Sequence, residues 1–119
     1  MNTQGDFDTD AVNRLHALGG DTLVTRIARL FADFAAARVN DAVTACEAGD
    51  LLRIADAAHA VRSSAANVGA TRLLGIATTL EQDARSGRTE SVPALVSDLR
   101  SAYDGARAYV LSCIPRGDA

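Results

Sequence analysis

The chain has few of the residues from which sheets, disulfide frameworks and membrane spans are built. Aromatic residues make up 4% of its 119 residues and tryptophan is absent, although hydrophobic residues as a whole reach 48%. This composition favours helices packed through alanine, leucine and valine over a sheet rich in aromatic side chains. A chain of this length can bury one core, so we expect a single helical domain over residues 1–119, with loose ends at about 1–6 and 115–119.

Long apolar runs, basic clusters and paired cysteines are lacking as well. No run approaches the roughly 20 residues of a membrane span, and the N-terminus has no secretion-signal pattern. The net charge is −3, with arginines and carboxylates interspersed, which argues against nucleic acid as a partner. Cys46 and Cys113 have neither metal-ligand nor redox spacing, so we expect buried thiols. These features predict a cytoplasmic protein without nucleic-acid or membrane partners.

Glycine residues that can end a helix recur along the chain, and Pro93 fits the first turn of the last segment. The resulting helices are predicted at about residues 8–18, 22–47, 51–68, 71–86 and 91–113. Long amphipathic helices joined by short loops make a bundle. The predicted fold is therefore all-α, an antiparallel up-down four-helix bundle with a short additional N-terminal helix across one end.

Apolar residues at three- and four-residue spacing mark a core face on each long segment. In the segment 51–68 this stripe consists of Leu51, Ile54, Ala58, Val61, Ala65 and Val68. In the segment 22–47 the same spacing predicts that the core face carries Leu23, Ile27, Leu30 and Phe34, with Val24 and Phe31 widening that face.

A single histidine stands beside the stripe of the segment 51–68. His59 lies about 100° around the helix from Ala58 at the centre of the stripe, so we expect it on the flank, partly open to water. Its neighbours on that face are mostly small or short. They are Leu52, Ala55, Asp56, Arg62, Ser63 and Ala66. We expect a partner protein to pack on a shelf formed by Leu52, Ala55, Ser63 and Ala66, with further residues of the preceding long helix.

These neighbours suit phosphoryl chemistry at the imidazole. A neutral histidine is a competent nucleophile near neutral pH, and Arg62, one turn on, can place a guanidinium beside a phosphorylated ring. The chain has no phosphate-binding loop, nucleotide loop or carboxylate cluster for magnesium. We therefore expect no bound cofactor or metal, and we expect the phosphoryl group and its Mg²⁺ to come from a partner. His16, near the end of the first helix, lacks such surroundings.

The sequence of residues 58–81 reads AHAVRSSAANVGATRLLGIATTLE. It resembles the histidine phosphotransfer (HPt) domains of bacterial multistep phosphorelays. In their signature a Leu and then Lys-Gly-Ser follow the histidine, and a Leu-Gly-Ala turn and a Leu-x-x-Leu-Cys-x-x-Leu-Glu helix come next. The matching positions are His59, Val61, Ser64, Val68-Gly69-Ala70, Leu73, Ile76, Leu80 and Glu81.

The resemblance implies a monomeric phosphoryl carrier of a two-component phosphorelay, without kinase activity of its own. A phosphorylated receiver domain of a hybrid histidine kinase would donate the group from its aspartate to His59. His59 would pass it to the receiver of a downstream response regulator, and Arg62 would stabilise the phosphoryl charge.

Two positions beside the histidine depart from the family pattern. Arg62 stands where the family usually has Lys, and Ser63 where it usually has Gly. The Ser63 side chain takes up room beside the imidazole, and its hydroxyl can either bond back to the His59 carbonyl or donate to the ring or the phosphoryl group. One alternative is therefore a module that docks on receivers with weak or no transfer. Another, the phosphoacceptor helix pair of a sensor kinase, is disfavoured because Ala60 occupies the position where that kinase motif has an acidic residue.

Overall fold

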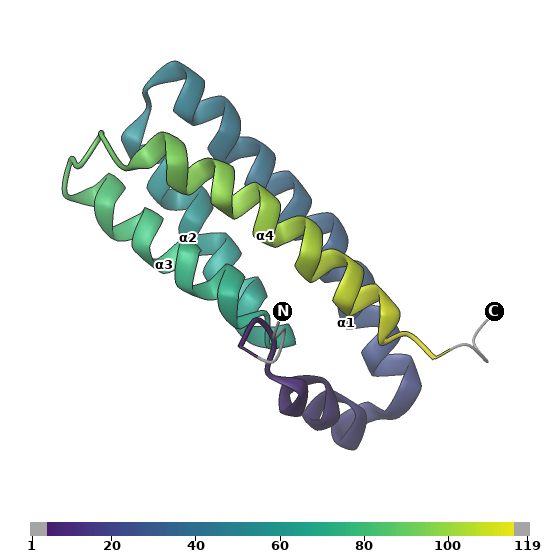
Figure 1. The fold of residues 1–119 in the computed structure, drawn as a ribbon. Coiled ribbons are helices and arrows are strands. Elements are labelled where there is room, and N and C mark those ends of the chain that lie inside the picture. Colours follow the sequence, from purple (N-terminus) through teal and green to yellow (C-terminus); the bar gives the residue numbers. More distant parts are fainter. Residues whose placement is uncertain (1–4, 116–119) are drawn as a thin grey trace.

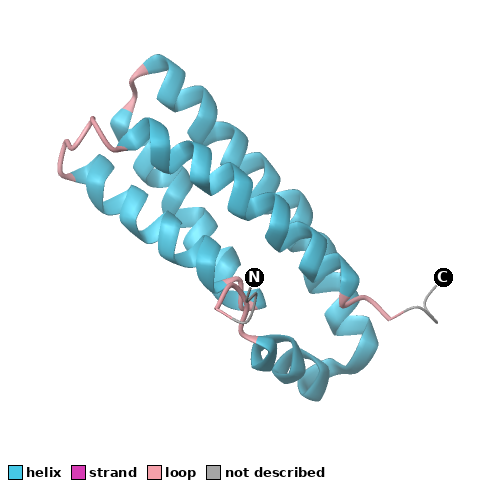
Figure 2. Cartoon of the chain, viewed as in Figure 1, coloured by secondary structure: helices cyan, strands magenta, loops and turns pink. Residues whose placement is uncertain are grey.

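The computed structural model describes residues 5–115, which form an all-α fold (Figures 1 and 2). The helices are α1 (Thr9–Ala48), α2 (Leu51–Val68), α3 (Thr71–Arg85) and α4 (Val92–Ser112). They run alternately up and down and are joined by short loops, so the predicted antiparallel bundle is confirmed. Residues 1–4 and 116–119, within the ends that we expected to be loose, lie outside the described part of the chain.

The first helix bends sharply at Gly20. This residue has φ 68° and ψ −159°, a backbone conformation that is open in practice only to glycine. The two helices predicted at residues 8–18 and 22–47 are therefore one element with a break where the prediction put a boundary. The part before the break crosses one end of the bundle, as expected for the additional N-terminal helix (Figure 1).

The segment before α1 is fastened to the turn between α2 and α3. The backbone N–H of Asp8 donates to the carbonyl of Gly69 at 2.7 Å, and that of Arg72 donates to the carbonyl of Asp6 at 3.2 Å. Gly69 has φ 74°, and a Cβ at this position would collide with the Asp8 carbonyl. The resulting contact holds residue 6, which we expected to be loose, against the end of the helix that carries His59.

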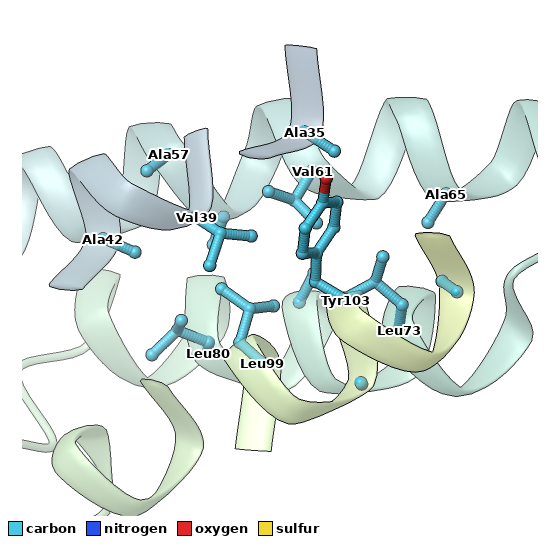
Figure 3. Close-up of a cluster of buried hydrophobic side chains, with 14 of the residues drawn as sticks. Ala35, Val39, Ala42, Ala57, Val61, Ala65, Leu73, Leu80, Leu99 and Tyr103 are labelled. Carbon is cyan, nitrogen blue, oxygen red and sulfur yellow. The ribbon is translucent and has the colours of Figure 1, made fainter. Parts of the chain in front are cut away.

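The core is built largely from small side chains. Ala35, Ala42, Ala58 and Ala65 are fully buried, which lets the helices approach closely. Larger side chains fill the centre of the bundle, where Figure 3 shows them meeting from all four helices. Those labelled there are Val39, Val61, Leu73, Leu80, Leu99 and Tyr103.

The core face predicted for the segment 22–47 is right at Val24 and Phe31 and wrong at its centre. Leu30 is 57% exposed and Phe34 49% exposed, while Leu23 and Ile27 are only half-buried. The buried stripe of α1 is shifted around the helix toward Val24 and Phe31. It consists of Val24, Ala28, Phe31, Ala35, Val39 and Ala42. Both stripes have helical spacing, and the one with smaller side chains faces α2 and α4 because it permits the closer packing.

Cys46 and Cys113 are free thiols and half-buried, so the prediction of buried thiols is wrong. Each lies near one end of a helix rather than in the middle of the core stripe.

Among the described helices, none combines the length and the apolar character needed to cross a membrane.

Candidate functional site

The second helix carries His59 at its middle and has well-defined ends. The Asp50 side chain caps its first turn by accepting from the backbone N–H of Arg53 at 3.2 Å, and Gly69 ends it in a left-handed conformation. Between these ends, the core stripe predicted for the segment 51–68 is buried, apart from the half-buried Leu51. His59 lies beside that stripe with 61% of its side chain exposed, as its spacing predicts.

A carboxylate from the third helix holds the imidazole. Nδ1 of His59 lies 3.1 Å from Oε2 and 3.4 Å from Oε1 of Glu81. Arg62 donates to Oε1 of the same carboxylate at 2.8 Å, and Nε of Arg85 donates to Oε2 at 3.1 Å. Glu81 is therefore the common partner of three side chains, two from α2 and one from its own helix.

Glu81 is only 7% exposed, yet its surroundings favour the ionised form. Burial alone would raise the pKa of this carboxyl. The hydrogen bonds from Arg62 and Arg85, together with the charge and hydrogen bond of His59, outweigh burial and hold the pKa of Glu81 below its ordinary value. At neutral pH the site thus contains a buried carboxylate anion.

The orientation of the ring follows from this anion. A carboxylate can only accept hydrogen bonds, so the proton of a neutral His59 belongs on Nδ1, next to Glu81. The lone pair then resides on Nε2, to which no described residue donates a hydrogen bond. Nε2 is consequently the nucleophilic atom of this side chain.

Arg62 and Ser63 keep close to the helix surface. Arg62, predicted to stand beside a phosphoryl group, has one N–H engaged by Glu81 while much of its side chain remains exposed. The Ser63 hydroxyl lies 3.5 Å from the carbonyl oxygen of His59, a weak hydrogen bond that turns the hydroxyl toward the backbone of α2. This is one of the two orientations that we considered from the sequence.

The predicted shelf is only partly at the surface. Leu52 is 67% exposed, and Ser63 and Ala66 are also exposed. Ala55 is fully buried, because α2 packs against α1 on one side and α3 on the other, so its prediction as a docking residue is wrong. A shallow hollow lined by His59, Arg62, Ser63, Ala66 and Leu74 opens beside the ring.

An apolar groove of about 260 Å³ lies between α1 and α2. Its lining consists of Ile27, Leu30, Phe31, Phe34, Ser64, Asn67 and Val68. Leu30 and Phe34, the two exposed residues that we misassigned to the core, therefore line this groove.

Sequence reasoning also missed the role of Glu81, to which it gave only a place in a family pattern. A signal was present, since Glu81 follows Leu73, Ala77 and Leu80 on the core face of α3. A carboxylate at a core position needs a partner. The sequence did not reveal which residue of α2 that partner would be.

The described residues hold no group of three or more histidine, cysteine or carboxylate side chains arranged to bind a metal ion. The network centred on the buried Glu81 carboxylate contains one imidazole and two guanidinium groups. Such a set can orient a nucleophile and stabilise negative charge.

An antiparallel helical bundle with an exposed histidine on one helix has the architecture of a phosphoryl-accepting domain. The family model of the Hpt domain matches residues 26–109, and the chain belongs to this family. It is thus a histidine phosphotransfer domain of the kind that works with receiver domains in phosphorelays.

Comparison with solved structures shows the same fold. The histidine-containing phosphotransfer protein B (HptB) from Pseudomonas aeruginosa PAO1 aligns with a TM-score of 0.84 over 90% of this chain and 92% of that chain, at 23% sequence identity. Among curated proteins, none gives a significant match.

Proposed function

We propose that His59 carries the phosphoryl group between the aspartates of two receiver domains. Its Nε2 attacks the phosphorus of a receiver's phosphoaspartate; the N–P bond forms as the P–O bond to the aspartate breaks, and the aspartate leaves as a free carboxylate. In the second transfer, the aspartate of another receiver attacks the phosphorus and the N–P bond breaks. The observation that carries the proposal is the Nδ1 contact with buried Glu81, which leaves Nε2 free.

Glu81 also suits the charge change at the ring. When neutral imidazole is phosphorylated on Nε2 and keeps its Nδ1 proton, the ring gains positive charge. The carboxylate that accepts this proton in a hydrogen bond stabilises the charge without taking part in covalent chemistry. No proton has to leave the site during the transfer, so no separate general base is required.

Arg62 would stabilise the phosphoryl oxygens. One N–H binds Glu81, and a guanidinium has four further N–H donors for an anion next to the ring. The Mg²⁺ that phosphoryl transfer requires would be bound by the receiver.

The receiver would dock on the face that contains the α1–α2 groove and the exposed part of the shelf. Leu30, Phe34 and Leu52 supply apolar contact area around His59, and Ser63 and Ala66 are small enough for close approach. Donor and acceptor would use this face in turn, with the chain acting as a monomer.

Transfer from phosphorylated receivers tests this proposal. Wild-type protein should acquire an acid-labile label, and His59→Gln should acquire none. His16→Gln is the matched control. His16 is also exposed, but it lies on α1 and not on α2, so its substitution should leave labelling unchanged. A label on His59→Gln would overturn the assignment of His59. A receiver that binds the wild type without labelling it would favour the docking module instead.

The docking-module alternative rests on Ser63, whose side chain replaces the usual glycine beside the ring. Its hydroxyl bonds back to the helix, so only the β-carbon stands in the path of a partner. This arrangement supports a carrier whose transfer is slowed rather than abolished.

A further inference from the structure

Arg85 shares its acceptor atom with the histidine. Its Nε and Nη2 both lie 3.1 Å from Oε2 of Glu81, and Oε2 is also the oxygen that lies 3.1 Å from Nδ1 of His59. Arg62 binds the other oxygen at 2.8 Å. The carboxylate is therefore held from both ends, and its orientation toward the ring does not depend on His59 alone.

A second carboxylate holds Arg85. Nη2 of Arg85 lies 3.5 Å from Oδ1 of Asp56, which is one helical turn before His59 on α2. Arg85 thus bridges the two helices that form the site, from Glu81 on α3 to Asp56 on α2. The ionised groups that face His59 from these helices are Glu81 and Arg85 on α3 and Asp56 and Arg62 on α2. Their charges balance.

The orientation of the carboxylate matters for the nucleophile. A carboxylate accepts the Nδ1 proton only while one of its oxygens points at the ring, and the lone pair then lies on Nε2. Two N–H groups of Arg85 on Oε2 hold this oxygen where it meets Nδ1. Arg85 therefore favours the form of the ring with its proton on Nδ1 and its lone pair on Nε2.

We propose that Arg85 is a positioning residue for the phosphotransfer, which holds Oε2 of Glu81 against Nδ1 of His59 and so keeps the lone pair of the ring on Nε2, and that Asp56 holds Arg85 in place. The inference rests on the proposed role of His59 and adds two residues that do not touch the phosphoryl group. Arg85 is half exposed, so its effect is that of a solvent-screened ion pair.

Nitrogen NMR of the unphosphorylated protein tests the effect on the ring directly. In wild type we expect the neutral ring of His59 to carry its proton on Nδ1. Arg85→Ala should increase the Nε2-protonated form, and Arg85→Lys should restore part of the wild-type spectrum. Arg88→Ala is the matched control, since Arg88 lies in the loop after α3 and pairs with Asp83 instead.

The phosphoryl acceptance rate gives the second readout. We expect Arg85→Ala to slow acceptance by about three- to fivefold at neutral pH, the size of effect typical of an exposed ion pair. Asp56→Asn should act in the same direction and more weakly, because it leaves Arg85 bound to Glu81.

A double-mutant cycle separates this mechanism from a general structural effect. In a Glu81→Gln background, Arg85→Ala should change the ring spectrum much less than in wild type. An unchanged spectrum in Arg85→Ala, or an equal change in Arg88→Ala, would overturn the proposal. The NMR result does not require any receiver, so a failure of phosphotransfer itself would be recognised separately by an unlabelled wild type.

Discussion

Nδ1 of His59 lies 3.1 Å from Oε2 of Glu81, although 22 residues separate them in the sequence. The contact joins the exposed face of α2 to the core face of α3. It depends on the turn at Gly69, which returns the chain antiparallel to α2, and on the rotation of α3 that points one carboxylate at the ring.

Glu81 should stabilise the fold in a pH-dependent way. Because the pKa of Glu81 is lowered on folding, its contribution to the free energy of unfolding is fully present above the ordinary value of 4.5 and is lost as pH falls through the lowered value. Denaturant melts of wild type and Glu81→Gln should therefore differ at neutral pH and converge under acid conditions. A difference that is constant with pH would contradict this account.

The exposed groove residues should matter for binding and little for stability. Leu30→Ser or Phe34→Ser should weaken receiver binding by about tenfold or more, because a central apolar contact is lost, while the free energy of unfolding stays within about 0.5 kcal/mol of wild type. Isothermal titration with the receiver and chemical melts measure the two quantities. Leu18→Ser is the control, since Leu18 is also an exposed large apolar residue of α1 but lies next to the Gly20 bend. Equal weakening by this control would remove the groove from the docking surface.

Ser63 should limit the approach of the partner through its β-carbon. Ser63→Gly should raise the transfer rate by a few-fold and lower the free energy of unfolding by about 0.5 kcal/mol, because glycine is the poorer helix former. Ser63→Ala keeps the β-carbon and should transfer at the wild-type rate. Timed transfer reactions with a phosphorylated receiver measure the rates of both variants, and denaturant melts measure the free energy of unfolding. If Ser63→Gly leaves the rate unchanged, crowding is not the cause of any slow transfer.

Two glycines of the same region should respond in opposite ways to alanine. Gly69→Ala introduces a β-carbon at φ 74° against the Asp8 carbonyl and should cost about 2 kcal/mol or more of unfolding free energy. Gly75→Ala, in the interior of α3 with open space around it, should stabilise by about 0.5–1 kcal/mol. Thermal melts followed by circular dichroism measure both. A tolerated alanine at position 69 would contradict the tight turn.

Helix limits and the exposure of His59 could be predicted from the sequence because they depend on local rules. Glycine at the helix ends and a continuous stripe in the segment 51–68 determine them. The core face of α1 could not be chosen in this way, because two stripes had the same spacing. The stripe with the larger side chains was predicted as the centre of the core face. The stripe that contains the alanines is the buried one, because it packs more closely.

Contacts between helices were the other part of the site that could not be predicted from the sequence. Arg85 and Asp56 carry no signal in the sequence and Glu81 only its core spacing, and the relation of all three to His59 depends on how α3 is rotated against α2. A resemblance to a family can mark such a position, as it did for Glu81, but it does not say which atom of the partner ring is engaged. That information comes only from the packed structure.

The buried alanines of α2 set a limit on how freely this protein can change. Ala58 and Ala65 have no exposed surface, so a larger side chain at either would push α2 outward and move His59 away from Glu81. Residues without any reactive group would then alter the reactive one. Substitutions that spare every polar side chain of the site can therefore silence it, and variants collected for loss of signalling should include changes at these two methyl groups.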